Sequence, residues 1–208
     1  MTRRGDGVMI PLPKPDLLIP AIRLDARQSA RDFMDRELAL DHVSALLFAA
    51  QGRRRGQDKR LVPSAGARYP LELTLAARRV QSLQPGLYRY AVDRHELDAL
   101  ETNGNPLSKV AAATFEAPWV ANSGAVLHFS AVFERTTEPY ANQPPLGRAE
   151  RYVWLEAGHA AQNAALVAAA LQLATVFIGG FDDEAMARAV KLPNVERPIG
   201  LMPIGFPG

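Results

Sequence analysis

Apolar and polar positions along the chain predict a mixed order of helices and strands. Apolar residues at near-helical spacing predict helices over 35–51, where Gly52 supplies the stop, over 106–115 and over 182–190. Apolar runs bounded by turn residues predict strands over 71–80, 86–90, 125–133, 175–178 and 199–204. Residues 136–148 hold three prolines and no periodic pattern, so we expect a loop of a length that often carries function.

The longest predicted helix spans 148–173. Its core, 157–170, is apolar or small almost all round, which is typical of a helix buried on most faces. Small side chains let backbones approach closely, so this helix is also suited to pack against another subunit. Together the elements predict an α+β sandwich around a mostly antiparallel sheet, formed by one domain over 1–208.

Four prolines lie within residues 1–24 and predict an extended N-terminal arm, laid over the surface or over a partner chain. Glycines and prolines, in place of an apolar run, follow Arg3 and Arg4, so we expect no secretory signal. The most apolar later stretch, 164–178, is interrupted by Gln172 and is too short to span a bilayer. We therefore expect a cytoplasmic protein with no membrane contact.

Composition points to a small anionic ligand. Of the 24 lysines and arginines, 20 are arginine, the residue that recognises phosphate and carboxylate groups through paired donors. The net charge of only +2 gives little support to nucleic-acid binding. Cysteine is absent, which excludes disulfides, thiolate metal sites and a cysteine nucleophile.

The first candidate site is a short basic segment containing Arg27, Gln28, Ser29 and Arg31. Two guanidinium groups and a hydroxyl at the start of a helix would suit a phosphate group. The alternative is an ordinary solvated helix start.

Two further candidates are loops of small residues. The first comprises Pro63, Ser64, Ala65, Gly66 and Ala67, where prolines flank a segment whose backbone can approach a ligand closely. The alternative is a simple connecting turn.

The other loop holds Gly179 and Gly180, which lead from a strand into a helix and leave backbone amides free to face a ligand. Here the alternative is a strand-to-helix turn capped by Asp182 or Asp183.

Tyr140, Glu156 and His159 form a fourth candidate. The spacing of Glu156 and His159 predicts that they share a helix face. A metal site would need a further ligand, and the other histidines show no ligand spacing, so we expect no metal and a buried, hydrogen-bonded His159. The basic run 53–60 is either a solvated loop or a guide for a phosphorylated cosubstrate such as NADPH.

The first three candidates, in this order and at these separations, resemble the nitroreductase family of flavin enzymes. Residues 60–73 and 155–163 are similar to the signature of one branch, the SagB-type dehydrogenases, which oxidise azolines in peptide natural-product pathways. The resemblance covers the chain from about Arg27 to Pro207. It implies a nitroreductase-like α+β fold, an intertwined homodimer and one FMN at each subunit interface.

The resemblance also implies roles for individual residues. Arg27 and Ser29, with Gln28 beside them, match positions that bind the FMN phosphate. Arg31 matches a basic position near the ribityl chain and the pyrimidine edge, where a fixed positive charge favours the anionic reduced flavin. Gly179 and Gly180 match backbone donors to flavin N5 and O4.

The small loop matches a segment that reaches the flavin from the partner subunit, through Pro63, Ser64, Ala65, Gly66 and Ala67. Ala67 stands where classical nitroreductases carry asparagine. The chain also lacks the C-terminal basic residue that contacts the phosphate in many relatives, and Arg60 or Arg68 are the candidates to replace it. Pro139-Tyr140 occupies the place of a Lys-Tyr pair in azoline dehydrogenases.

Three functional hypotheses follow. The leading one is an FMN-dependent oxidoreductase that takes hydride from NAD(P)H and passes electrons to a nitroaromatic, quinone or other conjugated small molecule in a ping-pong cycle. Tyr140 is its candidate proton donor or substrate contact. The alternatives are a SagB-type dehydrogenase that oxidises an azoline or peptide-derived heterocycle, and a non-catalytic flavin-binding protein.

Overall fold

A computed structural model of the chain describes residues 9–13 and 24–208, and its centre is an antiparallel sheet. The sheet has seven strands in the order β1-β4-β3-β2-β5-β7-β6, and neighbouring strands run antiparallel throughout. The strands are β1 (Met9–Pro11), β2 (Leu71–Ala77), β3 (Gly86–Ala91), β4 (Glu96–Thr102), β5 (Ala125–Ala131), β6 (Ala174–Thr175) and β7 (Arg197–Gly205). The predicted α+β class with a mostly antiparallel sheet is confirmed.

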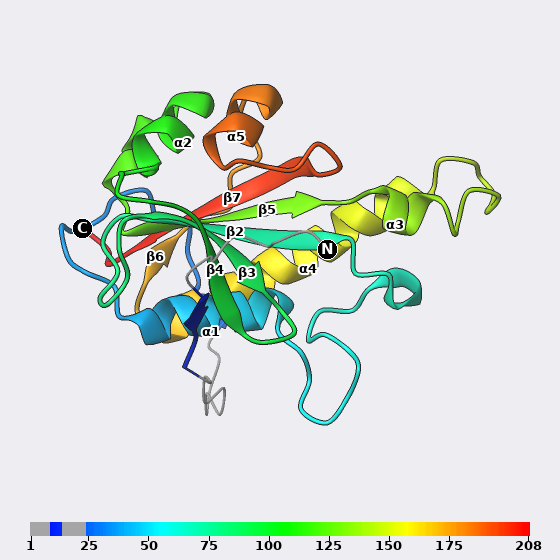
Figure 1. Cartoon of the computed structure of the whole chain (residues 1–208), viewed down its shortest axis with the longest axis horizontal. Helices are drawn as coiled ribbons and strands as arrows, with labels where there is room; N and C mark the ends of the chain where they lie inside the picture. The colour runs from blue at the N-terminus through cyan, green and yellow to red at the C-terminus, as the bar shows by residue number, and fades with distance from the viewer. Residues whose placement is uncertain (1–8, 14–23) are drawn as a thin grey trace, which may run out of the picture.

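Helices cover both faces of this sheet (Figure 1). α1 (Leu40–Gln51) and α4 (Ala149–Ala170) lie on one face, and α2 (Leu107–Ala113) and α5 (Asp183–Ala189) lie on the other. The short α3 (Glu134–Thr137) and the loop after it project away from the body of the molecule. Single turns of 3-10 helix occur at Leu24–Ala26, Ala65–Ala67 and Pro118–Asn122.

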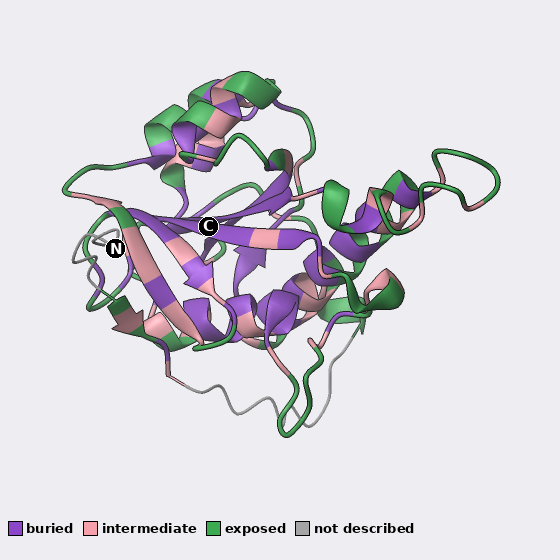
Figure 2. Cartoon of the chain, turned by 45° about the vertical axis from the view of Figure 1, so that its right-hand side comes forward, coloured by how far each residue is buried: buried purple, intermediate pink, exposed green. Residues whose placement is uncertain are grey.

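The middle of the sheet is apolar because it is covered twice. Every residue of β5 is buried, and β5 pairs with β2 on one side and β7 on the other. Figure 2 shows these central strands as mostly buried ribbons, while the outward faces of α2 and α5 are exposed. A strand with helices on both faces has no solvent side, which explains why all of 125–131, including His128 and Ser130, is buried rather than every second residue.

The long helix α4 packs closely because its inner positions are small. Five alanines face the core and are almost fully buried, at positions Ala157, Ala160, Ala161, Ala164 and Ala168. Across the contact with α1, Asn163 Nδ2 donates to the Ala49 carbonyl at 3.2 Å. The expectation of burial on most faces fails on one side, because Trp154, Leu155 and His159 are exposed in the isolated chain.

Several boundaries differ from the sequence prediction. The first helix begins at Leu40 rather than at residue 35, because Leu38 pairs with Val80 in a bridge beside the sheet. β4 was missed, since Glu96, Asp98 and Glu101 hide a strand with one fully buried residue, Leu97.

Part of the predicted N-terminal arm belongs to the sheet. Within the predicted arm 1–24, Met9–Pro11 form an edge strand paired with β4, and residues 1–8 and 14–23 lie outside the described part. No helix among the described residues is both long and apolar enough to cross a membrane.

His128 in the middle of β5 gives the fold a specific pH dependence. It is fully buried between Thr74 and Leu201 on the neighbouring strands, and both ring nitrogens lack a hydrogen-bond partner in the described chain. Burial, helped by the Arg89 cation, lowers the pKa of His128 from 6.5 to about 3. The folded chain therefore keeps this ring neutral where the unfolded chain would protonate it.

We predict that this histidine destabilises the fold in acid. Between pH 6.5 and 3 the unfolded state binds one more proton, so the wild type should lose about 1.4 kcal/mol per pH unit relative to His128→Leu. Urea unfolding of both proteins across this range measures the difference. If the free energies of unfolding of the two proteins change in parallel with pH, the His128 ring is not held neutral in the folded chain.

Candidate functional site

A cavity lies where the segment after the first 3-10 turn passes over α4. Its volume is about 270 Å³, and its three walls come from four segments that are separate in sequence. Arg27, Gln28 and Ser29 form one wall, residues of α4 form the second, and the third comprises Thr175, Val176, Phe177 and Met202. The structure thus places three of the four residues of the first sequence-predicted group, Arg27, Gln28 and Ser29, at one concave site.

Backbone pairing with β6 holds the first wall in place. Ser29 forms a bridge with Thr175, and the Ala30 amide donates to the Thr175 carbonyl at 3.0 Å. Arg27 is half-buried, and its guanidinium has no hydrogen bond or ion pair within the described chain. Thr175 has a buried hydroxyl that also lacks a partner there. Unpaired polar groups at a cavity wall are what a polar ligand would satisfy.

Small residues of α4 make the second wall. Gly158, Ala161 and Ala165 line the cavity together with Gln162. A Cβ atom added to Gly158 would meet no atom within 4 Å, so the glycine leaves open space rather than allowing a close helix contact. This space is available to a ligand.

The remaining members of the first and third groups do not line the cavity. Arg31 is exposed on the next stretch of chain, two residues beyond Ser29. Gly179 and Gly180 are exposed between the Ile178 bridge and α5, and the Gly180 carbonyl accepts from the Phe115 amide at 3.0 Å. Asp182 caps α5 by accepting from the Ala185 amide, as the alternative for that turn proposed.

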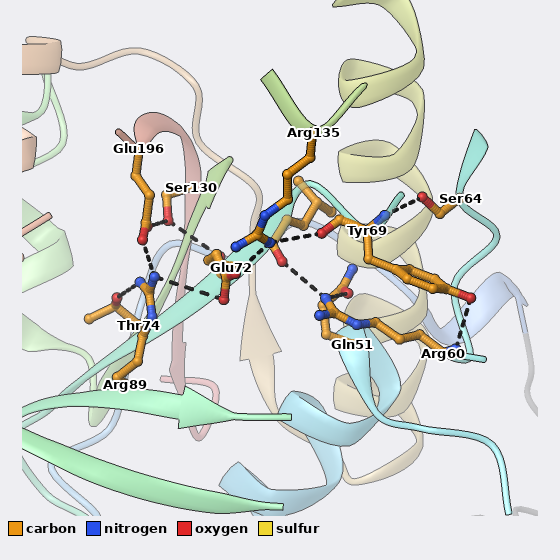
Figure 3. Close-up of polar contacts among 11 residues, drawn as sticks. Gln51, Arg60, Ser64, Tyr69, Glu72, Thr74, Arg89, Ser130, Arg135 and Glu196 are labelled. Carbon is orange, nitrogen blue, oxygen red and sulfur yellow. Dashed lines mark hydrogen bonds and ion pairs between the residues drawn. The ribbon is translucent and has the colours of Figure 1, made fainter. Parts of the chain in front are cut away.

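The second sequence-predicted group lies at a different place. Pro63, Gly66 and Ala67 are exposed, whereas Ser64 and Ala65 are half-buried. Ser64 Oγ accepts from the Tyr69 amide at 2.8 Å, which closes the loop on itself (Figure 3). Gly66 has φ of 56°, a backbone conformation that favours glycine.

Tyr140 joins this loop from the segment after α3. A side chain at Gly66 would collide with the Tyr140 hydroxyl, so the glycine allows the tyrosine to lie against the loop. The Tyr140 ring also packs edge-on against Tyr152 of α4, with centroids 5.4 Å apart. The structure therefore places Tyr140 with the Pro63–Ala67 loop and not with His159.

Glu156 and His159 do not share a helix face. Glu156 is 2% exposed and points into the protein, whereas His159 is exposed, so the expectation of a buried histidine was wrong. Among the described residues no cluster of histidine and acidic side chains could hold a metal ion.

Burial raises the pKa of Glu156 to about 7, an effect that the side chains of Ser64 and Gln51 and the Arg60 cation partly offset. The carboxyl group lies beneath the loop that carries Ser64. Sequence reasoning gave Glu156 a helix position but no signal of its burial, since a lone glutamate in a helix is ordinarily solvated.

A polar network behind the loop was also missed. Arg60 Nη1 donates to Gln51 Oε1 at 2.7 Å and to the Leu71 carbonyl at 3.1 Å, and its own amide donates to the Tyr69 hydroxyl (Figure 3). Arg60 therefore fixes the base of the loop. The only sequence signal was its place at the end of a basic run, which also fits a solvated surface.

Comparisons with known proteins identify the relatives of this chain. The model of the nitroreductase family matches residues 24–206. MJ1384 of Methanocaldococcus jannaschii, which is named as a nitroreductase, is 36% identical over 203 residues, covering 97% of this chain and 98% of that protein. The trifolitoxin-processing protein TfxB of Rhizobium leguminosarum is 28% identical over 181 residues, and this chain spans about half of it, 48%.

A solved structure extends the agreement to the fold. A crystal structure from Ralstonia eutropha that carries the nitroreductase name superposes with a TM-score of 0.76 at 27% identity. The match covers 96% of this chain and 90% of that one. The sequence and the architecture thus point to the same family.

We predict that the wild type is less stable at neutral pH than at pH 4.5 because of Glu156, and that Glu156→Gln lacks this pH dependence. The wild-type carboxyl is protonated up to about pH 7 when folded but ionises above 4.5 when unfolded, so raising the pH across this interval favours unfolding. The wild type should lose roughly 3 kcal/mol relative to the glutamine variant. The free energies of unfolding of the two proteins, measured with denaturant at pH 4.5 and 7.5, test this. If wild type and Glu156→Gln differ by the same amount at both pH values, the prediction is contradicted.

Proposed function

This chain belongs to the nitroreductase family of oxidoreductases, and we propose that it binds FMN, accepts hydride from NAD(P)H and passes electrons to a nitroaromatic, quinone or other conjugated acceptor in a ping-pong cycle. The observation that carries the proposal is the cavity between Arg27–Ser29 and the small residues of α4. Family membership alone supports a flavin oxidoreductase, and the cavity supplies residues suited to a phosphorylated flavin.

The residues of the cavity fit such a ligand. Arg27 offers an unpaired guanidinium, and Ser29 lies beside it with a hydroxyl that accepts or donates. Thr175 adds the buried hydroxyl that has no partner in the described chain. The absence of a side chain at Gly158 leaves room for a flat group against α4.

Each residue then has a distinct task. Arg27 and Ser29 would hold the phosphate, and exposed Arg31 would supply a fixed positive charge near the pyrimidine edge. Gly179 and Gly180 would direct backbone amides toward the reactive ring, since neither carries a side chain. The flavin, when bound, supplies the two-electron chemistry, and the protein positions it and favours its reduced charge state.

A homodimer would complete the site. The outer face of α4 exposes Trp154 by 47% and Leu155 by 53%, together with Gly158 and His159. Large apolar groups on a helix that is otherwise core-facing are typical of an interface. The Pro63–Ala67 loop would reach the flavin of the partner, which is consistent with its separation from the cavity of its own chain. Tyr140, packed on that loop, would then contact substrate or donate a proton.

A second candidate function is the dehydrogenase direction. The similarity to the trifolitoxin-processing protein favours it, because that protein is named for processing trifolitoxin rather than for reducing a nitro compound. In this case the substrate would be an azoline or a peptide-derived heterocycle, and NAD(P)H would not reduce the flavin. A non-catalytic flavin-binding protein is the third candidate, and the reduction experiment described next distinguishes it from the two enzymes.

We predict that purified protein is yellow, contains FMN and bleaches when NADPH or NADH is added without oxygen. A broad panel of nitroaromatics and quinones should then restore the oxidised spectrum. Protein that binds FMN but stays oxidised would favour the dehydrogenase, provided a heterocyclic substrate bleaches it. Protein that takes up no FMN would contradict every flavin-dependent function.

We further predict that Arg27→Ala weakens FMN binding by roughly tenfold to a hundredfold, because a charge-assisted hydrogen bond to phosphate is lost. Riboflavin, which lacks the phosphate, should bind equally to both proteins. Arg188→Ala on α5 is the matched control, since it removes an exposed arginine far from the cavity wall. Equal FMN affinity of the wild type and Arg27→Ala would contradict the phosphate assignment.

A further inference from the structure

A second concave site lies behind the Pro63–Ala67 loop. Its volume is about 480 Å³, and four arginines line it: Arg60, Arg68, Arg89 and Arg135. We call this site the arginine pocket. The acidic residues on its lining are Glu72 and Asp93, and Tyr69 and Tyr90 add aromatic surface.

Two of the four arginines are neutralised within the protein. Arg135 donates to Glu72 at 2.6 Å, and Arg89 pairs with buried Glu196 and lies 3.8 Å from Glu72 (Figure 3). Asp93 is paired with Arg53, which lies outside the pocket lining, at 2.9 Å. The carboxylates of the pocket are therefore already engaged.

The other two arginines have no carboxylate partner in the described chain. Arg60 is half-buried, and its side chain donates only to neutral acceptors, on Gln51 and Leu71. Arg68 is exposed and makes no hydrogen bond or ion pair with described residues through its guanidinium. Burial also lowers the pKa of Arg60, and the nearby carboxyl groups of Glu72, Glu156 and Asp93 offset part of this effect. Two guanidinium groups without a carboxylate at ion-pair distance in the described chain thus lie at one pocket.

The backbone around Arg68 is unusual. Ala67 and Tyr69, on either side of it, have φ of 53° and 47°, a conformation that residues with side chains rarely adopt. Such strain persists where the surrounding structure enforces it and clusters at ligand sites. It holds Arg68 next to the loop to which the proposed function assigns flavin contact.

We propose that the arginine pocket binds a phosphate monoester dianion. The charge of such a group, about −2 near neutral pH, suits the two guanidiniums that have no ion-pair partner in the described chain, and their several donors suit its oxygens. This inference rests on the proposed function for the identity of the ligand: the phosphate is then the 2′-phosphate of NADPH, which NADH lacks. The arginine pocket would therefore select NADPH over NADH. A phosphate on the electron acceptor has the same chemistry and is the other source.

The test measures binding of phosphate probes to the FMN-loaded protein by calorimetry. Adenosine 2′,5′-bisphosphate should bind at least tenfold more tightly than adenosine 5′-monophosphate, and Arg68→Ala should abolish the difference. Arg55→Ala removes the same charge from an exposed position outside the pocket and should preserve the difference. Binding of inorganic phosphate that depends on Arg68, without preference between the nucleotides, would assign the site to an acceptor phosphate.

The proposal is overturned if no probe depends on Arg68, or if Arg55→Ala and Arg68→Ala weaken binding equally. Rates of flavin reduction by NADPH and by NADH distinguish a failure of this proposal from a failure of the proposed function. Preference for the bisphosphate without flavin reduction by either cosubstrate would retain the phosphate site and reject the reductase. The opposite result is equal rates of flavin reduction by NADPH and NADH, with the same rates in Arg68→Ala and no probe binding that depends on Arg68. It would retain the reductase and reject the phosphate site.

Discussion

The close packing of α4 against α1 and the sheet is the constraint on which the rest of this structure depends. Buried alanines, among them Ala160 and Ala164, fix the rotation of the helix about its axis. That rotation places Gly158 beneath Arg27–Ser29 and turns Glu156 toward Ser64 and Gln51 on another side. One helix therefore defines both the cavity and the base of the Pro63–Ala67 loop, and its outer face, with Trp154 and Leu155, is left exposed. A bulkier residue at a buried alanine would disturb all three together.

Charge is distributed around this frame in two ways. Arg89, Arg135, Glu72 and Glu196 neutralise one another at the edge of the sheet, where a partly buried charge without a partner would be costly. Arg27, Arg60 and Arg68 have no carboxylate partner in the described chain, and each lies at a concave surface. The arginine-rich composition thus serves two ends, one structural and one suited to anionic ligands.

The sequence predicted the fold class, the long helix and most strands, because mainly apolar segments bounded by turn residues, such as 125–131, indicate buried strands. It missed β4, where acidic residues mask a strand with few buried positions, and it misjudged the face shared by Glu156 and His159. Arg27, Gln28 and Ser29 were recognisable by residue type and resemblance, and they meet in one cavity. The hydrogen bonds of Arg60 could not be recognised from the sequence, since its partners are brought together only by the tertiary fold.

The central claim is that each flavin site combines Arg27–Ser29 of one chain with the Pro63–Ala67 loop of another. The flavin content of mixed dimers, purified from co-expressed Arg27→Ala and Ala65→Glu chains carrying different tags, tests this directly. The account predicts that each variant alone binds little FMN, whereas the mixed dimer regains one intact site. Mixed dimers as empty of flavin as their parents would contradict a site shared between chains.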